Sequence, residues 1–190
     1  MSGQAASASC EYELDPLDRL AAVDDAWIAF ARDNGAPSLV PPGPMGRSVF
    51  DYISDPTTAE FYHAIFARVR KTGLPATLPF RCDAPALRRF LSLHIAPRQD
   101  GSLRLQSTVT RVEPRAPAAW ADHSGHSADE PLLRMCSWCK SINVGSEWLE
   151  IEEAVTRLGL FEGPARMVTH GICPACDARL RHEFDRDQPL

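Results

Sequence analysis

Two C-x-x-C pairs, Cys136–Cys139 (CSWC) and Cys173–Cys176 (CPAC), decide how the C-terminal part of this chain folds. Each pair forms a tight turn that directs two sulfurs toward one point, and four thiolates in a tetrahedron are ligands that Zn²⁺ accepts. Pro174 and Gly171 suit tight turns around the second pair. We therefore predict one zinc ion bound by the four cysteines of these pairs, which are Cys136, Cys139, Cys173 and Cys176.

These cysteines have two other interpretations. One is a redox-active dithiol or disulfide pair, with or without zinc. The other is ordinary packing of buried cysteines. The spacer between the pairs is longer than the roughly 15–20 residues of a usual zinc ribbon, so it must fold into structure of its own. His170 can replace one sulfur or donate a hydrogen bond to a thiolate. Because four cysteines complete the site, we expect the hydrogen-bonding role.

Length and composition limit the class of protein to which this chain can belong. The chain has 190 residues, is 44% hydrophobic and carries a net charge of −5, which allows one full domain and a small appendage. It has no apolar run of about 18 residues that predicts a transmembrane helix, and residues 1–9 lack the pattern of a secretory signal. Six cysteines in such a chain favour metal binding or reduced thiols, so we expect a cytoplasmic protein.

Residues 1–9 are expected to form a disordered tail, and the pattern of apolar residues predicts the elements that follow. We expect strands at 10–14 and 20–23, then a helix that Asp24 or Asp25 caps. A short helical turn follows at 49–53.

Asp55-Pro56 predicts the start of a longer helix, with Asp as N-cap and Pro at the first helical position, and Gly73 closes it. Three antiparallel strands follow, at 77–82, 91–96 and 103–109. The apolar helix positions are expected to face the inward strand positions; they are Phe61, Ile65, Phe66 and Val69 on the helix and Leu78, Phe80, Leu91, Leu93, Leu103 and Leu105 on the strands.

Residues 114–131 are rich in Ala and Pro and are interpreted as a linker, in which His123 and His126 are expected to be solvated. The zinc module then occupies 132–184, and 185–190 form a tail. An amphipathic helix is expected inside the spacer and a final helix near Pro174; the spacer helix carries Ile151, Ala154, Val155 and Leu158.

The order of elements over residues 10–113 resembles a PAS domain. The segments that carry this resemblance are 23–27 (VDDAW), 46–53 (GRSVFDYI) and the long helix that ends in KTG at 71–73. The later segment, with CSWC, Trp148 and HGICPAC, resembles a Cys-rich tail appended to many bacterial PAS-containing signalling proteins. The resemblance implies an α+β fold with a five-stranded antiparallel sheet, helices on one face and a pocket between them.

The resemblance does not identify what fills the pocket. Light-sensing flavin members carry an Asn-Cys-Arg-Phe motif that this chain lacks, and haem members use a His on the long helix, where His63 is the candidate here. Because the inward positions are nearly all apolar, we expect no bound chromophore in this domain. We interpret Cys10 and Cys82 as packing residues.

We expect a cytoplasmic signalling or sensor protein that is not an enzyme and acts through contacts with a protein partner. A homodimer is also expected, since the outward positions Ser92, His94 and Ala96 form a sheet face of small residues. Acidic residues outnumber basic ones after Leu132, which argues against nucleic-acid binding, and no membrane contact is expected.

Two alternatives stay open for the function. One is a redox sensor in which the zinc–thiolate cluster is the switch. The other is a thiol-disulfide oxidoreductase that uses Cys136 and Cys139, although the sequence around them lacks the βαβ pattern of such enzymes.

Overall fold

The computed structural model describes residues 9–84, 86–115, 132–160 and 167–186. Among these, the chain divides into two compact units, the first with 9–54, 59–80 and 89–112 and the second with 55–58, 81–88 and the described residues from 113 onward. The predicted tail up to residue 8, most of the predicted linker with His123 and His126, and the last four residues lie outside the described residues.

A five-stranded sheet contains all the strands before residue 115, in the order β2-β1-β5-β4-β3. β1 pairs antiparallel with both β2 and β5, with Tyr12 opposite Leu105. This confirms the α+β class and the five-stranded antiparallel sheet. The strands are β1 (Ser9–Leu14), β2 (Leu20–Val23), β3 (Ala76–Arg81), β4 (Leu87–Pro97) and β5 (Leu103–Pro114). Ser9, assigned to the disordered tail from the sequence, is the first residue of β1.

Four helical elements follow β2 and precede β3, and the two α-helices among them have the caps predicted from the sequence. The four elements are α1 (Asp25–Asp33), η1 (Pro37–Leu39), η2 (Val49–Tyr52) and α2 (Pro56–Thr72). Asp24 caps α1 by accepting a hydrogen bond of 2.7 Å from the Trp27 amide. Asp55 does the same before α2, where its carboxylate accepts from both the amide and the hydroxyl of Thr58. Gly73, with φ of 69°, ends α2 in the left-handed conformation.

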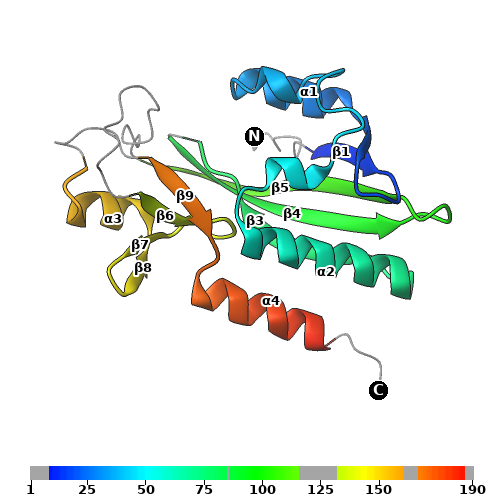
Figure 1. The fold of residues 1–190 in the computed structure, drawn as a ribbon. Helices are drawn as coiled ribbons and strands as arrows, with labels where there is room; N and C mark the ends of the chain where they lie inside the picture. Colours follow the sequence, from blue (N-terminus) through cyan, green and yellow to red (C-terminus); the bar gives the residue numbers. More distant parts are fainter. Residues whose placement is uncertain (1–8, 85, 116–131, 161–166, 187–190) are drawn as a thin grey trace, which may run out of the picture. The chain divides into compact units, whose positions relative to one another are not determined.

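The core of the first unit lies between α2 and the sheet, and α2 extends along the strands (Figure 1). The predicted helix stripe is buried, and Leu78, Leu93, Leu103 and Leu105 are buried on the strands. Phe80 and Leu91 are only partly buried. Arg81 follows the inward Phe80, so strand alternation predicts that it is exposed; it is buried instead, because charged partners enclose it.

The second unit has a four-stranded sheet of its own, in the order β8-β7-β6-β9. Its elements are β6 (Leu133–Cys136), β7 (Ile142–Val144), β8 (Glu147–Leu149), α3 (Ile151–Arg157), β9 (Val168–Gly171) and α4 (Pro174–Arg186). The spacer therefore contains strands as well as the predicted helix α3. A small core joins α3 to the sheet; its buried residues are Leu133, Ile142, Ile151, Ala154, Val155 and Leu160. The last helix begins at Pro174, as predicted, and continues to Arg186.

Candidate metal centre

The first cysteine pair lies in the hairpin that joins β6 to β7. Cys136 is the last residue of β6, and its amide donates a hydrogen bond of 2.8 Å to the Ser141 carbonyl, while the Lys140 amide donates to the Cys136 carbonyl at 3.0 Å. Lys140 closes the turn with φ of 64°, a left-handed conformation that is uncommon for a residue with a side chain. Its ammonium donates to the Ser137 carbonyl at 2.9 Å, inside the same turn. These bonds hold the two sulfurs of this pair on one side of the hairpin.

The second cysteine pair begins α4, at the end of the neighbouring strand. β9 pairs parallel with β6, with Gly171 opposite Cys136, so the chain reaches Cys173 at the same edge of the sheet. Cys173 precedes the first helical residue and acts as an N-cap, because its sulfur accepts the Cys176 amide at 3.4 Å. Pro174 occupies the first helical position, where its missing N–H costs nothing.

The tertiary structure brings all four sulfurs together. Their Sγ atoms lie within 4.8 Å of one another, and those of Cys139 and Cys173 are 3.7 Å apart. Tetrahedral zinc with bonds of about 2.3 Å separates its sulfur ligands by about 3.8 Å, so the cage is close to the size that the ion needs. Cys139 is partly exposed, whereas the other three cysteines are buried, and all four are free thiols. The group can hold a metal ion.

The thiols of this cluster differ in how readily they ionise. Hydrogen bonds from Cys139 and Cys176 lower the pKa of the Cys136 thiol strongly, whereas hydrogen bonding to Cys136 and Cys139 raises that of Cys176. Burial raises the pKa of Cys173 to about 11. The Cys136 thiol therefore ionises most readily, and its negative charge disfavours ionisation of Cys173 and Cys176. A cation between the sulfurs would favour ionisation of more than one of them, and its binding would release protons.

Groups around the sulfurs supply further positive potential. The Cys173 amide donates to the sulfur of Cys136 at 3.4 Å, and the Arg179 guanidinium lies 4.0 Å from the sulfur of Cys176. The N-terminus of α4 adds the positive end of its helix dipole. These donors stabilise negative charge on the sulfurs.

The structure describes two of the histidines considered as ligands from the sequence, His170 and His63. His170 lies on β9, opposite Met135, with its side chain only partly covered, and the group of metal-ligand candidates found among the described residues comprises the four cysteines without it. Partial burial and the nearby Lys140 ammonium lower the pKa of His170. His63 is exposed on α2, where its ring stacks on Phe50 with centroids 3.6 Å apart. The other two cysteines, Cys10 and Cys82, are partly buried.

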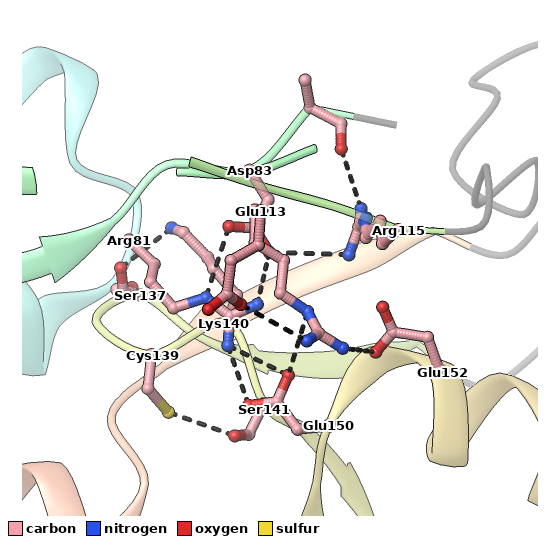
Figure 2. Close-up of polar contacts among 12 residues, drawn as sticks. Arg81, Asp83, Glu113, Arg115, Ser137, Cys139, Lys140, Ser141, Glu150 and Glu152 are labelled. Carbon is pink, nitrogen blue, oxygen red and sulfur yellow. Dashed lines mark hydrogen bonds and ion pairs between the residues drawn. The ribbon is translucent and has the colours of Figure 1, made fainter. Parts of the chain in front are cut away.

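Sequence reasoning missed a charged network beside the cysteine hairpin, shown in Figure 2. Arg81 donates to both oxygens of Glu150, at 2.8 and 3.0 Å, and to Asp83 at 2.5 Å, with only 7% of its side chain exposed. Burial acts to lower the pKa of Arg81, but its hydrogen bonds to these carboxylates raise it overall, so the charge is retained. No local pattern predicts this network, because Glu150 lies far along the chain from Arg81.

Two further arginines of the second unit extend this network. The Arg88 guanidinium lies 2.7 Å from a carboxylate oxygen of Glu152, on α3. Arg115 donates to the Ala84 carbonyl at 3.0 Å and lies 3.5 Å from Asp83. The described residues of the segment 81–88 are therefore attached to this unit by both side-chain and backbone contacts.

Comparisons with known proteins give little further information. No family model matches this chain, and no curated protein matches it. A solved structure described as a domain of an HTR-like protein from Haloarcula marismortui ATCC 43049 is similar at a TM-score of 0.41, with 14% identity over 55% of this chain and 100% of that one. A similarity at this level assigns no family. No helix in the described part of the chain is long and apolar enough to cross a membrane.

Proposed function

We propose that Cys136, Cys139, Cys173 and Cys176 bind one structural Zn²⁺, and that the chain is a cytoplasmic signalling protein in which a PAS-like unit is joined to this zinc module. The observation that carries the metal assignment is the convergence of four sulfurs to within 4.8 Å. An all-thiolate, largely buried set of four is the ligand set of closed structural zinc sites, which leave no position for a substrate.

The size of the module supports a structural role for the metal. Its buried core is small, and its strands have only three or four residues. A core of this size supplies only a few kcal/mol, whereas structural zinc contributes apparent values of about 10–16 kcal/mol. We propose that zinc supplies the free energy that keeps the cysteine hairpin, β9 and α4 folded together.

The proposal of a PAS-like unit rests on the order of its elements and on the sequence segments that resemble the family. Helices inserted between β2 and β3 of a sheet ordered β2-β1-β5-β4-β3 agree with that resemblance. We propose that this unit acts as a sensor through contacts with a protein partner or a second copy, without catalysis and without binding nucleic acid or membranes.

Metal analysis tests the central proposal. We expect about one zinc per chain by mass spectrometry of the purified protein, and substoichiometric zinc after replacing any one of the four cysteines with Ser. Cys10→Ser is the matched control, because this partly buried cysteine lies in β1 of the first unit and is not one of the clustered sulfurs. The C-terminal module should become protease-sensitive in the four site variants and stay resistant in the control. Full zinc content in all four single variants would show that the assignment is wrong.

A second candidate function is a redox sensor, and the partial exposure of Cys139 favours it. An oxidant can reach this sulfur first, and oxidation of a bound thiolate would release the metal. Mild peroxide treatment with a chromogenic zinc indicator tests this idea. Release that thiol reductant reverses, and that Cys139→Ser alters in rate, supports the sensor; zinc retained until the protein unfolds supports a purely structural ion.

A thiol-disulfide oxidoreductase is the weakest of the three functions. Cys136 is completely buried, whereas an attacking thiol of such an enzyme must be accessible to its substrate. We expect no reduction of a model disulfide by the reduced, metal-free protein above the rate of free thiols.

A further inference from the structure

We infer that Arg81 is a positioning residue of the metal centre, so that metal binding and attachment of the segment 81–88 to the second unit stabilise each other. This inference rests on the proposed zinc site and deepens it, because it adds a residue that reports whether the metal is bound. Arg81 lies far before the first metal-ligating cysteine in the sequence and is not itself a ligand.

The turn between the first two cysteines is held by backbone contacts with other segments. Each of the two residues between these cysteines, Ser137 and Trp138, makes a backbone hydrogen bond to a residue outside the turn. The Ser137 amide donates to the Gly171 carbonyl at 2.7 Å, which ties the turn to the strand that leads to the second cysteine pair. The Arg81 amide donates to the Trp138 carbonyl at 2.9 Å, which ties the same turn to the end of β3. Arg81 therefore helps to set where the sulfurs of this pair lie.

The side chain of Arg81 fixes the position of its own backbone. Its guanidinium is enclosed by Asp83 and by Glu150, the residue that precedes the first turn of α3 (Figure 2). α3 is packed on the small sheet through Ile151, Ala154 and Val155, so Glu150 is anchored to the core of this unit. A buried guanidinium that loses one of these carboxylates is left poorly solvated, and the segment around it then loosens.

Coupling follows from the reciprocity of linked equilibria. When the metal fixes the hairpin, the Trp138 carbonyl is held in place to accept the Arg81 amide. When the metal leaves, this acceptor moves with the relaxed turn and the contact weakens. The boundary between the two compact units falls within β3, directly before Arg81. Metal binding therefore changes how firmly the backbone of Arg81 is held. Arg81 is the last residue of β3, and the other residues of this strand belong to the first unit.

Zinc affinity in a pair of matched variants tests the inference. Arg81→Met keeps a similar length but removes the guanidinium, and we expect zinc to bind about 10–100-fold more weakly in competition with a chelator, as when outer partners of metal ligands are removed. Arg157→Met is the control, because Arg157 belongs to the same unit and pairs with Glu147 and Glu153 on its surface, 44% exposed. Its zinc affinity should equal that of the wild type. Glu150→Gln, a milder change on a half-exposed side chain, should weaken zinc binding less than Arg81→Met.

Hydrogen exchange of the unaltered protein gives a second readout that needs no variant. Amides of 81–84 should exchange faster after zinc is removed, while those of 61–69 in α2 should not change. Equal exchange of 81–84 with and without zinc, or wild-type zinc affinity in Arg81→Met, would overturn the inference while leaving the zinc site intact. A wild-type chain that binds no zinc would overturn the proposed function and this inference together. If Arg81→Met does not fold, Glu150→Gln and the exchange experiment decide.

Discussion

Cys173→Ser isolates the role of the sulfur in metal binding from its role in the helix. Cys173 is the N-cap of α4, and its sulfur accepts the Cys176 amide. Ser is itself a favoured N-cap, so the replacement keeps a hydrogen-bond acceptor at the start of the helix. The loss that remains is that of one metal ligand in a buried site.

The expected loss of zinc-binding free energy follows from the number of sulfur ligands. Four equivalent sulfurs share an apparent zinc binding free energy of about 10–16 kcal/mol, so one sulfur accounts for about 3 kcal/mol. That loss weakens zinc binding by roughly 100-fold, since each 1.4 kcal/mol or so corresponds to a factor of ten. We expect a larger effect if the module unfolds once the site is incomplete.

Equilibrium competition with a chelator of known affinity measures this change, and circular dichroism at saturating zinc reports whether α4 stays folded. Cys10→Ser, in β1, controls for the general effect of replacing a partly buried cysteine. A dissociation constant for Cys173→Ser within about threefold of the wild type corresponds to less than about 1 kcal/mol. That result would refute the role of this sulfur as a ligand.

Four other predictions address stability, pH, assembly and colour. Asp55→Ala removes the cap of α2, with its two bonds to Thr58, and should lower the free energy of unfolding by about 1–2 kcal/mol in urea titrations, whereas Asp25→Ala should have a smaller effect. The pKa of His170 is lowered in the folded state, so the stability that this group contributes is present above its unfolded pKa of about 6.5 and decreases as the pH falls below that value. His170→Gln should therefore flatten the dependence of the unfolding midpoint on pH between about pH 7 and 5. Sedimentation should detect a dimer that a charged replacement of the exposed His94 weakens; a monomer at high micromolar concentration would contradict this. Finally, the purified protein should be colourless, and stoichiometric visible absorbance would instead indicate a bound flavin or haem.

Local patterns in the sequence were sufficient to predict those elements whose physical cause is local. The Asp–Pro start and Gly end of α2, the apolar stripe between them and the alternation in β3 and β5 depend on neighbours a few residues away. The two C-x-x-C pairs likewise indicated a four-cysteine group, since each turn brings its own two sulfurs together, and the four sulfurs do lie together. The tertiary structure was needed to show where the two turns meet.

Arrangements that join distant segments became visible only in the folded structure. β6 and β9 have four residues each, too few for a reliable periodicity, and their parallel pairing places Gly171 opposite Cys136. Arg81 lies at a position where alternation predicts exposure, yet Asp83 and Glu150 enclose it. Strand pairing and the burial of a charge depend on which partners the whole fold places beside a residue, and those partners lie too far along the chain for any local pattern to specify.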